Sequence, residues 1–179
     1  MLPLPRELLL ALQARAARGA LGALSMRSAG AKGAVRAGRL FLCEVDLGDF
    51  RTASGSRFRA ALDGTTAGLQ DAFPRQARHW GLARKGLNLF LRECLSNAYL
   101  RDAYSLQMAE ASYEVPLDSI TGGHLHRLSG GTLPRWATVR DLTPEVSDEF
   151  QAVAARIAVE RGIARVHLDA IWWGERAGR

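Results

Sequence analysis

The sequence predicts a mainly α-helical domain, and three observations support this fold class. Several segments repeat apolar residues at three- and four-residue intervals, as on one face of a helix. No segment alternates apolar and polar residues as a half-buried strand does. The 179 residues, of which 47% are hydrophobic and 23% charged, suffice for the core of one water-soluble domain. We therefore expect a compact multi-helix domain.

The first 38 residues differ from the rest in composition. They are rich in Ala, Arg, Gly and Leu and contain a single acid, Glu7. An amphipathic helix interrupted by Gly19 and Gly22 is one interpretation; a transit-like segment, a weakly ordered arm or an over-long gene start are others. We divide the chain into this basic segment, residues 1–38, and a helical domain, residues 39–179.

The central segments give the strongest helical signal. Residues 39–50 fit a strand or a short helix, and residues 56–73 have apolar residues at helical spacing until Pro74 stops the pattern. Residues 82–99 form the clearest helix, with an apolar side and a second side that carries Lys85, Asn88 and Arg92. Residues 103–110 extend this helix or form a short one.

Three elements follow in the C-terminal third. A helix could begin at Asp118, although Gly122 and Gly123 each weaken it by about 1 kcal/mol relative to Ala. The pair Thr143-Pro144 predicts a capped helix with proline in its first position, ending at Gly162. The last element, "RVHLDAIWWGER", carries two tryptophans.

Composition limits the functional classes. No apolar run approaches the length of a membrane span, and no Cys/His spacing matches a zinc site, so we expect neither membrane nor metal. We expect Cys43 and Cys94 to be reduced core thiols, and His124 and His126 to be solvated loop residues. The net charge of +6 favours a polyanionic partner, nucleic acid first. Of 24 basic residues only Lys32 and Lys85 are lysines, so the base composition of the genome explains the arginine-rich charge equally well.

Lys85 is a candidate nucleophile. It lies near the start of an apolar helix, where the helix dipole disfavours a positive charge. Partial burial would lower its pKa further, and the neutral amine could then attack an electrophile, which an arginine cannot do. A solvated surface lysine is the plainer alternative.

Asp118, in "YEVPLDSITGG", is a candidate catalytic carboxylate. At a helix start it would accept backbone N–H bonds, stay ionised, and stabilise a cationic transition state or take a proton. An ordinary helix cap is the plainer alternative.

Together, "GLARK" before a helix and "VPLDS" some thirty residues later resemble the helix-hairpin-helix superfamily of DNA glycosylases. That superfamily has a G-x-G-x-K hairpin, whose lysine matches Lys85, and a later "VPVD" segment, whose aspartate matches Asp118. The spacing is closest to the archaeal GO glycosylase branch, which removes 8-oxoguanine. Ala83 stands where the hairpin has its second glycine, and Leu89 where the family has an aromatic residue.

A third segment, "GIARVHLDAIWW", is similar to the "GIPPLHLD" segment of the same branch. There an aspartate and a tryptophan four residues later hold the flipped base, and they match Asp169 and Trp173. Positions i and i+4 share a helix face, so the two side chains could act together. Without the resemblance, a C-terminal helix that docks two tryptophans on the core accounts for the same residues.

The resemblance implies a helix-hairpin-helix glycosylase fold and a bifunctional DNA glycosylase/AP lyase for oxidised purines in base-excision repair. Lys85 and Asp118 would be catalytic, and Leu89, Asp169 and Trp173 would bind the base. The DNA backbone would be bound by Gly81, Ala83, Arg84 and Arg92. No metal or other cofactor is implied. The expected partner is damaged double-stranded DNA. We expect the protein to be a monomer in the cytoplasm, associated with the nucleoid. A non-catalytic nucleic-acid-binding protein and a helical protein-interaction domain are the alternatives.

Overall fold

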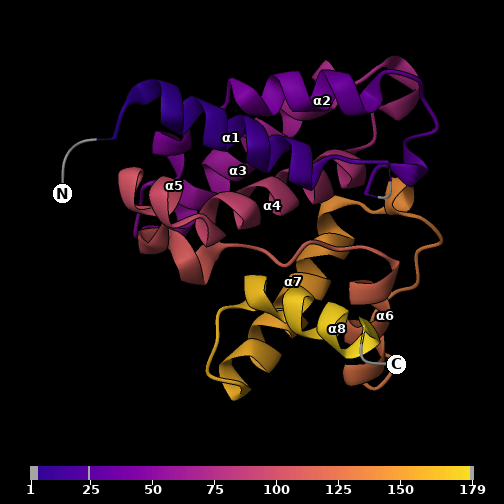
Figure 1. The fold of residues 1–179 in the computed structure, drawn as a ribbon. Helices are drawn as coiled ribbons and strands as arrows, with labels where there is room; N and C mark the ends of the chain where they lie inside the picture. The colour runs from indigo at the N-terminus through magenta and orange to yellow at the C-terminus, as the bar shows by residue number, and fades with distance from the viewer. Residues whose placement is uncertain (1–3, 24, 178–179) are drawn as a thin grey trace.

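The computed structural model describes residues 4–23 and 25–177, and these residues form helices with no strand (Figure 1). The mainly α class is therefore confirmed. The α-helices are α1 Arg6–Ala20, α2 Ala34–Cys43, α3 Gly55–Ala72, α4 Trp80–Ser96, α5 Ala98–Ala103, α6 Ser119–Leu128, α7 Pro144–Glu160 and α8 Leu168–Ala177. Short 3₁₀ helices are η1 Arg27–Ala29, η2 Leu47–Phe50, η3 Arg75–Ala77, η4 Leu106–Ser112, η5 Val139–Asp141 and η6 Arg165–His167.

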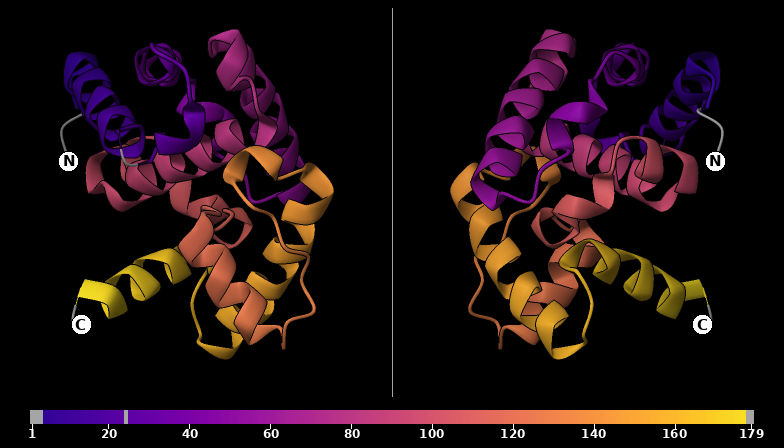
Figure 2. Two further views of the ribbon diagram at one scale, coloured as in Figure 1. Left: turned by 90° about the vertical axis from the view of Figure 1, so that its right-hand side faces the viewer. Right: turned by 90° about the vertical axis from the view of Figure 1, so that its left-hand side faces the viewer.

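The core consists of two hydrophobic clusters. The first is formed by α1 to α5, with α4 running beneath α1, α2 and α3 (Figure 2). The second joins α6, α7 and α8 to the extended segment that precedes α6. The side chain of Trp136 packs against both clusters. The candidate site described below lies where α4 of the first cluster meets α6 and α8 of the second.

Local signals set most helix ends. Ser54 caps α3 by accepting from the Arg57 N–H, and Thr143 caps α7 with Pro144 in the first position, as predicted. The predicted continuous helix 82–99 is wrong at its end, because the Asn97 side chain accepts from two backbone N–H groups and starts α5 there. Residues 39–50 belong to α2 and η2, so the helical alternative holds for them.

The N-terminal segment does not stand apart from the domain. The predicted boundary after residue 38 falls inside α2, and is therefore wrong. Helix α1 packs on α4 and α2 through small side chains that allow close approach. Its buried residues include Ala16, Ala17 and Ala20. Gln13, also buried, donates to the carbonyl groups of Leu42, Cys43 and Val45 and so satisfies the end of α2.

Candidate functional site

The predicted residues Lys85, Asp118 and Asp169 come together between the two hydrophobic clusters. Lys85 lies in the second turn of α4 and is half-buried. Its Nζ donates to the backbone carbonyl of Ser25, 3.0 Å away, in the segment that links α1 to α2. The negative charges of Asp118 and Asp169 both act on this ammonium group. An amine from α4 thus lies within electrostatic reach of carboxylates from α6 and α8.

Burial makes Lys85 a better candidate nucleophile. Desolvation is the main cause that lowers the pKa of Lys85 below the ordinary value of 10.5. Asp118 and Asp169 oppose this shift by favouring the charged form, while Arg27 adds to it by repulsion. The net effect is a larger fraction of neutral amine at any given pH than an exposed lysine has.

Asp118 is the N-cap of α6, as both interpretations of this residue from the sequence expect. Its Oδ1 accepts from the backbone N–H groups of Ile120 and Thr121, each at 2.9 Å. The preceding residues Val115 and Leu117 are buried in the second cluster. Both backbone groups of Val115 are bonded to the amide of Gln151 in α7. The apolar residues before Asp118 therefore fix the direction of its carboxylate.

Asp169 connects the three helices around Lys85. Its side chain is 2% exposed and accepts from Arg92 of α4 through Oδ2 and from the Thr121 hydroxyl of α6 through Oδ1. Burial raises the pKa of Asp169, and the Arg92 charge opposes that shift. Both carboxylate oxygens are engaged inside the protein, and the direct contact of Asp169 with a base stays a prediction.

The predicted backbone-binding arginines are also engaged internally. Arg84 is 2% exposed, donates to Glu114, Thr66 and Asp63, and lies over the Trp80 ring. Arg92 is paired with Glu93 and Asp169. Both guanidinium groups are therefore held by acids inside the protein, and the phosphate contacts of Arg84 and Arg92 stay predictions.

Gly81 and Ala83 do not form a hairpin. Both are buried in the first turn of α4, which begins at Trp80, and the connection to α3 runs through residues 73–79. A Cβ built on Gly81 would collide with the carbonyl oxygen of Val139 in η5. The glycine is therefore needed for close packing with η5, and the DNA contact by the amides of Gly81 and Ala83 stays a prediction.

The structure separates the two adjacent tryptophans of α8. Trp172 is 1% exposed and stacks on His124 with ring centroids 5.1 Å apart, whereas Trp173 is 49% exposed. One tryptophan therefore docks on the core, and Trp173 remains open to a ligand. Leu89, one turn after Lys85, is half-buried against the first cluster. His124 lies in α6, where the sequence had suggested a solvated loop.

Sequence reasoning missed the N-terminal contribution to this site. Ser25 takes part through a backbone carbonyl, which leaves no signature in side-chain pattern, and Arg27 belongs to a segment that had been set apart from the domain. Thr121 was also missed, although its place three residues after the cap Asp118 puts it in the first turn of α6. That spacing is the one signal that could have found it.

The described residues contain no group of three His, Cys, Asp or Glu side chains placed to hold a metal ion. Among the same residues, no helix has the length and apolar character that crossing a membrane requires. Comparison with protein-family models, curated proteins and solved structures gave no match.

Proposed function

We propose that the chain is a DNA glycosylase/AP lyase that removes an oxidised purine of the 8-oxoguanine type through a Schiff base on Lys85. One observation carries the proposal: a half-buried lysine of lowered pKa lies within electrostatic reach of Asp118 and Asp169, which come from distant parts of the sequence. A solvated surface lysine, the plainer alternative for Lys85, does not fit this burial.

The reaction begins with the neutral amine. The lone pair of Lys85 Nζ forms a bond to the anomeric carbon, C1′, while the glycosidic bond breaks and its electron pair leaves with the base, which takes up a proton. Loss of the amine proton and opening of the sugar ring then give the protonated Schiff base. Removal of a C2′ proton finally expels the 3′-phosphate and nicks the strand. No redox step and no external co-reactant are required.

Asp118 has two tasks in this scheme. Its negative charge stabilises the positive charge that develops on the sugar, and its carboxylate accepts the proton that the amine loses. The helix cap serves both tasks, because two N–H bonds to Oδ1 hold the carboxylate in one orientation.

Asp169 is a positioning residue in this scheme. It holds Arg92 and Thr121 and thereby fixes α8 against α4 and α6. Trp173, four residues further along α8 and half-exposed, supplies an aromatic face for a base.

Borohydride trapping tests this function. With a duplex that carries 8-oxoguanine, we expect the wild-type protein to form a covalent adduct and to nick the lesion strand, and Lys85→Gln to lose both. Lys32→Gln is the matched control, since Lys32 is the other lysine of the chain and is exposed. If the wild type forms no adduct with any oxidised-purine lesion or abasic site, the proposed enzyme activity is wrong.

A further inference from the structure

The net charge of the protein resides entirely in its first 43 residues. They contain seven basic residues and one acid, and the remaining 136 residues contain equal numbers of both, 17 of each, so the first part accounts for the whole net charge of +6. In the fold this part comprises α1, α2 and the segment between them, which lie together on one side of the molecule (Figure 1). The charge is therefore concentrated on one helix pair.

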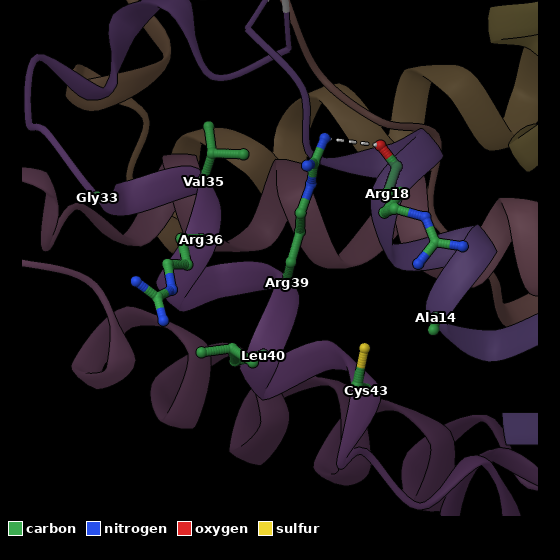
Figure 3. A pocket seen from close by; sticks show the side chains of 8 residues that line it. All are labelled: Ala14, Arg18, Gly33, Val35, Arg36, Arg39, Leu40 and Cys43. Carbon is green, nitrogen blue, oxygen red and sulfur yellow. Dashed lines mark hydrogen bonds between the residues drawn. The ribbon is translucent and has the colours of Figure 1, made fainter. Parts of the chain in front are cut away.

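A pocket of about 480 Å³ lies between α1 and α2. Figure 3 shows Arg18, Arg36 and Arg39 around it, with Val35 and Leu40 among the apolar residues of its wall. No acid is among its lining residues. Three cations thus surround an open pocket without a carboxylate in its wall.

These three arginines are not neutralised by the protein. The ion pairs found among the described residues involve other side chains. Arg39 is held instead by two backbone carbonyls. Its Nε donates to the Leu21 carbonyl at 2.7 Å. Its Nη2 donates to the Arg18 carbonyl at 3.2 Å, the bond drawn in Figure 3. Neutral acceptors orient the guanidinium and leave its positive charge uncompensated.

The arginines of the other helices have different contacts. Arg59, Arg84 and Arg92 each pair with acids of the same chain, and each of them pairs with an acid on another element. Those arginines hold the fold together, whereas the arginines of the α1–α2 pocket form no ion pair with an acid among the described residues. A functional role is therefore easier to assign to Arg18, Arg36 and Arg39 than to Arg84 or Arg92.

We infer that the pocket between α1 and α2 binds the phosphate backbone of a nucleic-acid duplex. Arginine presents several N–H donors in a fixed fork that matches phosphate oxygens, and phosphates along a strand repeat at short intervals. Three guanidinium groups on two adjacent helices can therefore contact successive phosphates. Such contacts position a duplex and carry no sequence information.

An anionic membrane surface fits this face less well. A helix that lies in a membrane surface needs a free apolar face, and the apolar faces of α1 and α2 are used in the core. Buried residues on these faces include Ala17, Ala20 and Leu42. Leu8, Leu10 and Leu40 stay exposed on these helices, so the vesicle arm of the experiment below decides between a membrane and a duplex.

The same chain segment connects this pocket to the candidate nucleophile. Residues 21–33 link α1 to α2, and within them Ser25 accepts from Lys85 Nζ. Only this link to catalysis rests on the proposed glycosylase function; phosphate binding does not. A duplex bound to α1 and α2 would therefore influence the segment that positions the amine of Lys85.

The salt dependence of binding tests the inference. Fluorescence anisotropy with a short labelled, undamaged duplex is measured over a series of salt concentrations, with Lys85→Gln as the background so that no chemistry intervenes. Each phosphate contact contributes about 0.9 to the slope of log affinity against log salt. We therefore expect Arg18→Gln combined with Arg36→Gln to make the slope shallower by roughly 2 and to weaken binding at low salt.

The matched control is Arg156→Gln combined with Arg161→Gln, which removes two exposed charges at the far end of α7. We expect this pair to leave the slope nearly unchanged. Equal effects of the two pairs would overturn the inference, because net charge alone would then explain binding. Binding to phosphatidylglycerol vesicles without binding to the duplex would overturn it as well. Failure of the glycosylase proposal would show differently, as absence of trapping in the wild type with duplex binding retained.

Discussion

Asp118 combines a structural and a proposed chemical role in one side chain. As the N-cap of α6 it satisfies two backbone N–H groups, and its charge acts on both Lys85 and Asp169. The cap orients the carboxylate, and the charge is what the proposed reaction uses. Because asparagine caps a helix as well as aspartate does but carries no charge, the two roles can be separated.

We therefore predict that two substitutions of Asp118 both slow trapping but differ in their effect on stability. Asp118→Asn should keep the thermal midpoint and slow borohydride trapping by about 10²–10⁴-fold, the usual range for loss of a general base. Asp118→Ala should also cost about 1 kcal/mol of stability through loss of the cap. Thermal unfolding and trapping rates measured on both variants check this. Normal trapping by Asp118→Asn would leave Asp118 as a plain cap.

At this scale the sequence predicts a helix cap better than it predicts side-chain partners. The cap at Asp118 follows from a short polar side chain before a helix, and the candidate nucleophile follows from a lysine at a helix start. That Asp169 is held by Arg92 and Thr121 could not be predicted, because it depends on how three helices pack. The same holds for Arg84, whose burial depends on the acid Glu114, thirty residues away in sequence.

At the scale of elements, the packing of α6 explains one of its two adjacent glycines. A Cβ on Gly122 would lie 2.6 Å from Cζ2 of Trp136, whereas a Cβ on Gly123 would have no neighbour within 4 Å. Trp136 packs against both clusters and lies edge-on to Phe150, so it has little freedom to yield. Gly122 is thus required for contact with Trp136, and nothing in the structure explains Gly123.

Two alanine substitutions in α6 should accordingly have opposite signs. Gly122→Ala should destabilise the protein by about 1–3 kcal/mol through overpacking. Gly123→Ala should stabilise it by about 0.5–1 kcal/mol, since alanine suits a helix interior better than glycine does. Urea denaturation of both variants gives the two values. A stabilising Gly122→Ala would mean that Trp136 moves freely.

Helix ends were predictable where a local signal sets them, as at Pro74, Thr143 and Gly162. Close approach between helices has no such signal. The spacing of Gly81 from Lys85 predicts a hairpin. The structure places this glycine in close contact with η5. A glycine pattern alone cannot distinguish a turn from a tight helix contact.

At the scale of the whole molecule, a buried ion pair ties the segment before α6 to the first cluster. Arg84 and Glu114 are both almost completely buried and bonded at 2.9 Å, and Asn88 also donates to Glu114. Arg59 of α3 joins this group to Asp148 of α7. The network therefore spans α3, α4, the segment before α6 and α7.

Arg84→Met should for this reason act on stability. It leaves Glu114 buried without its main partner, and breaking such a pair costs about 3–5 kcal/mol. Arg101→Met, which removes an exposed pair with Asp102, should cost less than about 1 kcal/mol. Equilibrium unfolding compares the two. If Arg84→Met kept full stability and lost affinity for a duplex, Arg84 would be a DNA contact after all.

At this scale the sequence predicts the net charge and the fold class, but it does not predict how the helices pack together. The sequence marks the first residues as basic, and a weakly ordered arm is one of the interpretations that it allows. In the fold, alanine side chains such as Ala16, Ala17 and Ala20 allow α1 to lie close to its neighbours and complete the core. Composition cannot show this, because it depends on the surface that α2 and α4 present.

The central claim is that Lys85 is the nucleophile, and locating the trapped adduct tests it most directly. The wild-type protein is reduced with borohydride on a duplex that carries 8-oxoguanine or an abasic site, digested, and mapped by mass spectrometry. Lys85 and Lys32 are the two lysines of the chain, so the assignment is unambiguous. We predict that the sugar remnant is found on Lys85. A remnant on Lys32 or on the N-terminal amine, or no adduct with either duplex, would contradict it.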